Sequence, residues 1–133
     1  MMLGDKAASA MYGFLCENSE TIGVKKNRIF KYERPEKLTV GDYIVVNHLP
    51  FTHRDIISEG VVNVNVHSPR TVSNEPAKKL QIIVGNLLAV FGEERYLGGA
   101  YFEPYSDSRP TPDNDGTYYI NLKFNITYNN LKD

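Results

Sequence analysis

Residues Gly60–Ser68 have the sequence GVVNVNVHS, in which valine alternates with polar residues. Successive side chains of a β-strand point to opposite faces, so Val62, Val64 and Val66 share one face while asparagine and histidine share the other. One apolar and one polar face is the pattern of an antiparallel sheet that is covered on a single side. We therefore expect the valine face to meet the core.

The stretch Thr117–Tyr128 repeats this alternation over 12 residues, which is long for a strand in a small domain. Its two faces are an apolar set, Tyr118, Ile120, Leu122, Phe124, Ile126 and Tyr128, and a mainly polar set, Thr117, Tyr119, Asn121, Lys123, Asn125 and Thr127. The polar faces of both strands are consistent either with solvent-exposed sheet or with a polar contact between subunits.

A helix is predicted over Leu80–Phe91, where apolar residues recur at offsets of 0, 3, 4, 7, 8 and 11. The preceding segment, Ser73–Pro76, has the composition of a helix entrance, and Gly92 is placed to end the helix. A first amphipathic helix is predicted over Asp5–Glu17, with Asp5 as its cap.

Shorter strands are expected at Arg28–Tyr32, Tyr43–Leu49 and Leu97–Tyr105. Leu49–Ser58 is predicted to be an exposed hairpin loop with Phe51 as an apolar exception at its tip, and Ser106–Gly116 to be a long, polar, solvent-facing loop. The order of helix, three strands, helix and two strands indicates a single α+β domain over residues 1–133. We expect a mostly antiparallel sheet of about five strands, packed on one side by two helices.

Composition excludes several classes of partner. Lysine and arginine total 15 and aspartate and glutamate 16, so the net charge of -1 gives no broad positive field for nucleic acid or an anionic membrane. The single cysteine, Cys16, cannot form an internal disulfide, and the N-terminal stretch lacks the pattern of a secretory signal. An intracellular protein with no membrane and no specific nucleic-acid partner is the expectation.

No catalytic, cofactor-binding or metal-ligating residue is predicted. The three histidines, His48, His53 and His67, match no ligand spacing, although His48 and His67 fall on adjacent predicted strands and could be cross-strand neighbours. Cys16 has no neighbouring base or cation to activate it, and acidic pairs such as Asp113 with Asp115 lie in predicted turns, where solvated charge is the ordinary explanation.

The chain resembles the tail-terminator and head–tail joining proteins of tailed bacteriophages. The resemblance covers roughly Lys31–Tyr128 and rests on YIVVNHLPF, EGVVNVNVHSP, KKLQIIVGNLLAVF and GTYYINLKFNIT in that order. It implies a structural phage or prophage protein, without catalytic residues or cofactors, that assembles as a homo-oligomeric ring, expected to be a hexamer. The implied partners are tail-tube and head-connector proteins. The protein would be cytoplasmic during assembly and then part of the virion.

Contacts with neighbouring subunits are expected from loop residues. The candidates are Phe51, Thr52, His53, Arg54, Asp55, Arg70, Asn74, Tyr105, Asp107, Arg109 and Asp113. The alternative is a small-ligand-binding or enzymatic α+β domain with a pocket between sheet and helices, lined by Tyr12, Tyr101, Tyr118 and Phe124. An enclosed apolar pocket with convergent polar groups would distinguish this alternative from a ring subunit.

Overall fold

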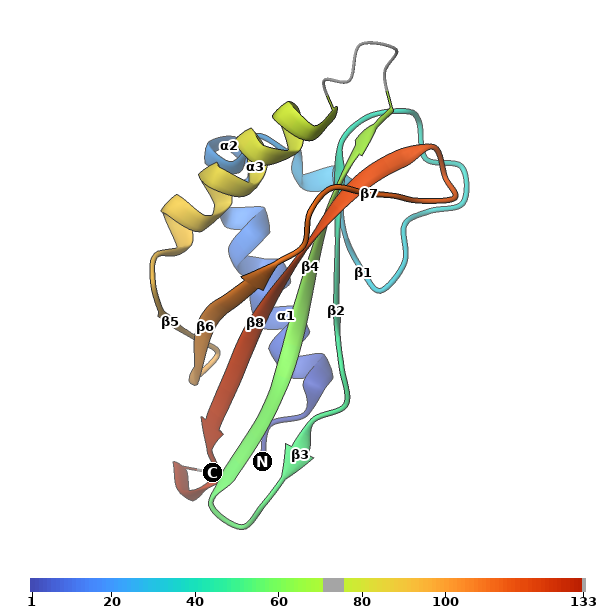
Figure 1. Cartoon of the computed structure of the whole chain (residues 1–133). Helices are drawn as coiled ribbons and strands as arrows, with labels where there is room; N and C mark the ends of the chain where they lie inside the picture. Colours follow the sequence, from blue (N-terminus) through green and yellow to red (C-terminus); the bar gives the residue numbers. More distant parts are fainter. Residues whose placement is uncertain (71–75, 133) are drawn as a thin grey trace.

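The structure, a computed structural model, describes residues 1–70 and 76–132. Over these residues, two main helices pack against one face of a curled, mostly antiparallel sheet (Figure 1). The α+β class predicted from the sequence is confirmed.

The described residues form three α-helices, two 3-10 helices and eight strands. The helices are α1 (Gly4–Glu17), α2 (Ser19–Ile22) and α3 (Pro76–Phe91), with 3-10 helices at Lys26–Arg28 and Asn130–Lys132. The strands are β1 (Ile29–Lys31), β2 (Tyr43–His48), β3 (Thr52–His53), β4 (Ile57–Pro69), β5 (Arg95–Leu97), β6 (Ala100–Asp107), β7 (Thr111–Pro112) and β8 (Thr117–Asn129). Helix α3 starts with Pro76, a residue suited to a first helical turn. The rest of its predicted entrance, Ser73–Glu75, lies outside the described residues.

The two long strands, β4 and β8, form the centre of the sheet. Each has 13 residues, and they pair antiparallel from Ile57 opposite Asn129 to Pro69 opposite Thr117. The order across the sheet is β1-β2-β4-β8-β6-β5, with β3 paired to β4 and β7 paired to β8. The β1–β2 pair is parallel.

The core lies between this sheet and the helices. All six residues of the predicted α3 stripe lie in it: five are buried, and Leu88 is half-buried. Val62, Val64 and Val66 of β4 are fully buried beneath the helices, as predicted. The Phe91 ring lies 5.2 Å from Phe14 of α1 and 4.9 Å from Phe124 of β8, so one side chain joins both helices to the sheet.

The described residues form eight strands rather than about five. One reason is the pair Gly98–Gly99, whose φ angles of 58° and 84° are those of a two-residue turn that glycine favours. This turn folds Arg95–Asp107 into the hairpin β5–β6, where a single short strand was predicted.

The segment Ser106–Gly116 is not the free loop that was predicted. Because β8 is so long, its edge continues beyond the end of β6, and the segment folds onto that edge. Thr111 and Pro112 pair with Tyr119 and Tyr118, and the amide of Ser108 donates to the carbonyl of Asn121 at 2.9 Å.

The prediction that Asp5 caps α1 is also wrong. The helix starts one residue before Asp5, and Leu3 precedes it without a capping side chain. The Asp5 carboxylate instead accepts a hydrogen bond of 2.6 Å from the hydroxyl of Tyr32. Its negative charge, in the first turn of α1, still interacts favourably with the positive end of the helix dipole.

Within the described residues, none of the helices is both long enough and apolar enough to cross a bilayer.

Replacing Leu87 by Ala is expected to lower the free energy of unfolding by about 2 to 5 kcal/mol, through lost burial and the cavity that remains. Denaturant titration measures this change. The exposed neighbour Gln81, replaced by Ala, is the control and should shift stability by about 0.5 kcal/mol or less. A similarly small effect for Leu87→Ala would contradict the assignment of the stripe to the core.

Candidate functional site

The outer face of the sheet, away from the helices, carries a row of stacked rings across its three central strands. His67 of β4 is opposite Tyr43 of β2 on one side and Tyr119 of β8 on the other. Ring centroids are 4.3 Å apart for Tyr43 and His67, with planes 8° from parallel, and 5.2 Å apart for His67 and Tyr119. His67 is only 7% exposed.

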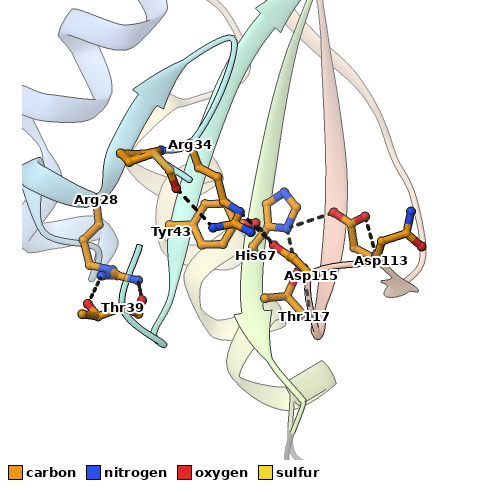
Figure 2. Close-up of polar contacts among 10 residues, drawn as sticks. Arg28, Arg34, Thr39, Tyr43, His67, Asp113, Asp115 and Thr117 are labelled. Atoms are coloured by element: carbon orange, nitrogen blue, oxygen red, sulfur yellow. Dashed lines mark hydrogen bonds and ion pairs between the residues drawn. The ribbon is translucent and has the colours of Figure 1, made fainter. Parts of the chain in front are cut away.

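Asp115, in the turn between β7 and β8, is bonded to this row (Figure 2). One carboxylate oxygen accepts from the amide of Thr117 at 3.0 Å and from its hydroxyl at 2.5 Å. The other oxygen accepts from the hydroxyl of Tyr43 and lies 3.3 Å from Nε of Arg34. Asp115 therefore ties the turn to β2 and to the segment that follows β1.

His67 completes the cluster through Nδ1. This atom lies 3.0 Å from Oγ1 of Thr117 and 3.8 Å from a carboxylate oxygen of Asp113. Because the Thr117 hydroxyl already donates to Asp115, we assign Nδ1–H of His67 as the donor to Thr117. Figure 2 shows these groups converging from β2, β4 and the β7–β8 turn.

Burial and hydrogen bonding together determine the protonation of the cluster. Burial lowers the pKa of His67 below 6.5, against the opposing effect of Asp115 and Asp113, and the imidazole is neutral at pH 7. Burial also acts to raise the pKa of Asp115, but hydrogen bonds from Thr117 and Tyr43 outweigh it and keep the pKa below its ordinary value. The pKa of Tyr43 is raised by burial and by its bond to Asp115, so its hydroxyl stays a donor.

The same cluster contains three side chains of the kind that bind cations. One ligand atom from each of His67, Asp113 and Asp115 lies within 4.8 Å of the others. However, both oxygens of Asp115 already accept hydrogen bonds, and the Arg34 guanidinium lies where it would repel a cation. We therefore interpret the cluster as a set of contacts that fixes the β7–β8 turn and the Arg34 segment against the sheet.

A groove opens beside this cluster. It has a volume of about 420 Å³ and lies between the segment Arg34–Gly41 and the end of the β4–β8 pair. Arg70 borders it, with its guanidinium 5.1 Å from the ring of Tyr118 and one NH group donating to the carbonyl of Asp113 at 3.2 Å. The groove is open and mixed in polarity, unlike the enclosed apolar pocket that a small-molecule site needs.

Further along the outer face, the polar side chains bond to one another. Asn63 donates to Asn47 at 2.9 Å, Lys123 donates to Asn63 at 2.9 Å, and Asn121 donates to Asn65 at 2.8 Å. The amides in this part of the face already have partners, so a neighbouring subunit is not needed to satisfy them.

The fold is shared with a solved structure. Of 19 matching chains of solved structures, one is 20% identical to this chain, covers 96% of it and 96% of its own length, and superposes with a TM-score of 0.62. Its name consists of a sequence identifier and describes no activity, so the likeness shows the fold alone. No protein-family model matches the chain, and no curated protein does.

The predicted contact residues fall in three places on this fold. Phe51–Asp55 lie around β3, at one end of the long strands, and Arg70 and Asp113 lie together at the opposite end. Tyr105, Asp107 and Arg109 lie at the end of β6 and just beyond it. The remaining candidate, Asn74, lies outside the described residues.

Phe51 is not a free apolar side chain at a loop tip. It is half-buried against the core, and a Cβ placed on Gly60 would come within 2.1 Å of its ring. The ring of His48 meets it edge-on at 5.8 Å. Packing within the chain therefore explains why an apolar residue occupies position 51, because Gly60 has no side chain and the Phe51 ring fills the space above it.

Two alternatives that the sequence left open are not seen in the described residues. His48 is opposite Val62 and His67 is opposite Tyr43, so the two histidines are separated along the strands. The suggested aromatic pocket does not form either. Tyr101 is opposite Thr127 on the outer face and bonds Glu94, whereas Phe124 is fully buried on the inner face.

The sequence prediction missed Tyr43, Thr117, Tyr119 and the bonded role of Asp115. Tyr43 and Asp115 are 72 residues apart in the sequence. The available signal was an aromatic or histidine residue near the end of three predicted strands, but a strand register was needed to place these rings in one row.

Because the pKa of His67 is lowered in the folded protein, we expect the protein to become less stable as the pH decreases. Below pH 6.5 the unfolded chain binds a proton that the folded chain excludes, so the free energy of unfolding decreases as the pH falls, by at most about 1.4 kcal/mol per pH unit for one group. His67→Phe keeps a ring in the stack and should flatten the dependence between pH 7 and pH 5, measured by denaturant titration. The exposed His53, replaced by Gln, is the control and should leave the dependence in place. An unchanged slope in His67→Phe would assign it to another group.

We expect no divalent metal to be needed for folding, because Arg34 and the hydrogen bonds of Asp115 occupy the candidate ligands. Protein purified without a tag should keep its thermal midpoint in excess EDTA. Elemental analysis that finds a stoichiometric metal, lost in Asp113→Asn, would contradict this expectation and identify the ligands.

Proposed function

We propose that the protein is a non-catalytic structural subunit of a tailed phage or prophage, acting in a ring as a tail terminator or head–tail joining component. The observation that carries the proposal is the separation of the candidate contact surfaces on one rigid sheet. The hairpin at β3 and the Arg70–Asp113 region lie at opposite ends of the paired strands β4 and β8 (Figure 1). A ring requires two different, complementary patches on every subunit, and surfaces at separate ends can provide them.

The polar cluster supports this role rather than chemistry. Its hydrogen bonds and the Arg34 ion pair hold loop segments in fixed positions, and no buried side-chain polar atom of the described residues lacks a hydrogen-bond partner. Catalytic groups need an accessible reacting atom, whereas both oxygens of Asp115 are engaged and His67 is buried. A fixed surface is what repeated contact with identical neighbours needs.

The resemblance of the element order to that of tail-terminator and head–tail joining proteins supports the biological context of the proposal. In that context the subunits meet in the cytoplasm, close a ring on the end of a tail tube and remain in the virion. The partners are further copies of the chain, tail-tube protein and the head connector. The near-neutral net charge of -1 leaves little electrostatic repulsion between copies, so it does not oppose their association through surface contacts.

The test is assembly of the purified protein, measured by sedimentation velocity and electron microscopy over a range of concentrations, alone and with tail tubes. We expect closed rings, with a hexamer as the predicted size, and rings at tube ends that stop elongation. Bovine serum albumin at the same concentration is the control for non-specific crowding of the tubes. A protein that stays monomeric in both conditions would overturn the proposal.

A further inference from the structure

The turn Arg54–Ile56, here called the tip, presents three exposed side chains on a fixed backbone. The amide of Arg54 donates to the carbonyl of Ile57 at 2.9 Å. Asn130, just after β8, binds the turn twice: its side-chain amide donates to the carbonyl of Arg54 and its backbone amide to that of Ile56, both at 2.7 Å. Ile56 is nevertheless 57% exposed. The chain therefore holds a large apolar side chain in solvent on a turn that is bonded in place.

A groove lies between α3 and the end of β6, here called the α3–β6 groove. It consists of two adjoining hollows of about 190 and 400 Å³, both bordered by Asp107. The apolar side chains that line it are Val84 and Leu88 of α3 and Ile120 and Leu122 of β8, and Arg109 is on its rim. The groove offers space for an apolar side chain between two opposite charges.

Between Leu80 and Phe91, the exposed face of α3 beside this groove carries no charge, while the exposed Lys78 lies one turn earlier. The exposed residues between Leu80 and Phe91 are Gln81, Ile82, Gly85, Asn86 and Ala89. Gly85 lines the groove, and a Cβ placed there would meet nothing within 4 Å, although glycine in a helix costs about 1 kcal/mol relative to alanine. Depletion of charge is a property of the central part of protein interfaces.

The charges of the tip and the groove are complementary. Arg54 and Asp55 follow one another on the tip, and Asp107 and Arg109 border the groove. In the part of the chain that the structure describes, none of these four side chains forms an ion pair. In a parallel approach, Arg54 would meet Asp107 and Asp55 would meet Arg109, and Ile56 would enter the larger hollow toward Val84 and Ile120.

The tip cannot reach the groove of its own chain. Ile57, next to the tip, and Val64, which is opposite Leu122 in the groove, are both on β4. Seven residues of extended strand separate them by about 23 Å. Only another molecule can bring the two surfaces together.

We propose that the tip of one copy of this chain binds the α3–β6 groove of the next copy. This inference rests on the proposed function and specifies the contact within the ring. The second of the two patches is then the α3–β6 groove rather than the Arg70–Asp113 region. The contact is head-to-tail, since each copy contributes its tip to one neighbour and its groove to the other. Repetition of such a contact around an axis closes a ring.

A charge exchange tests the pairing. Asp55→Arg and Arg109→Asp are each expected to weaken self-association about tenfold or more by placing like charges together, and the double variant should recover most of the lost affinity. Glu17→Arg, an exposed charge change at the end of α1 and outside the tip, the β3 hairpin and the groove, is the matched control and should leave association unchanged. Sedimentation velocity measures the association, and denaturant midpoints confirm that each variant folds.

Cross-linking gives a second readout that does not depend on charge. In a Cys16→Ser background, Ile56→Cys combined with Gly85→Cys should give a ladder of disulfide-linked oligomers, because a disulfide requires Cα atoms within about 7 Å. Ile56→Cys combined with Tyr96→Cys is the control, since Tyr96 is exposed on β5, away from the groove.

The outcomes separate this inference from the proposed function. Rings of the wild type, without recovery in the double variant and without cross-links above the control, would overturn the tip–groove contact and leave the ring role standing. Recovery and cross-linking in open filaments would support the contact and overturn the closed ring. A wild type that never associates would overturn both.

Discussion

The continuous pairing of β4 with β8 is the constraint on which the other features depend. A ladder of 13 residues on each strand fixes which side chains face the helices and which face outward, because a shift of one residue would exchange the two faces. The same register places His67 between Tyr43 and Tyr119 and places Ile120 and Leu122 beneath α3. Both the polar cluster and the α3–β6 groove are therefore products of one strand alignment.

The sequence predicted what depends on local periodicity. The alternation of Val62, Val64 and Val66 and the stripe of α3 are visible within short windows, and burial confirms both. The sequence did not predict the pairing of Ser108–Pro112 with β8, because that pairing depends on where β6 stops along β8, which only the strand register shows. The hairpin at Gly98–Gly99 had a local signal in its two glycines, but their positive φ angles were not inferred.

The candidate site was less predictable than the fold because its contacts join distant segments. Asp115 and Tyr43 meet only after β2, β4 and β8 are aligned, so neither residue carries a motif that shows the link. Phe51 illustrates the opposite error. An apolar residue in a polar stretch suggested a contact with another molecule, but Gly60 leaves room for the ring within the same chain. Exposure of Ile56 on a bonded turn is the stronger indication of a surface for a neighbour, and only the structure shows it.

The order in which the two halves of this ladder are synthesised also matters. His67 and Thr117 are 50 residues apart, so β4 leaves the ribosome well before the strand that pairs with it, and such non-local pairing forms slowly. The α3–β6 groove is incomplete until Ile120 and Leu122, which line it, have been synthesised. The tip lacks the hydrogen bonds that hold its backbone until Asn130 is present. A nascent chain therefore lacks both the donor and the acceptor surface. In the ring that we propose, completion of β8 would therefore be required before a subunit could bind its neighbours.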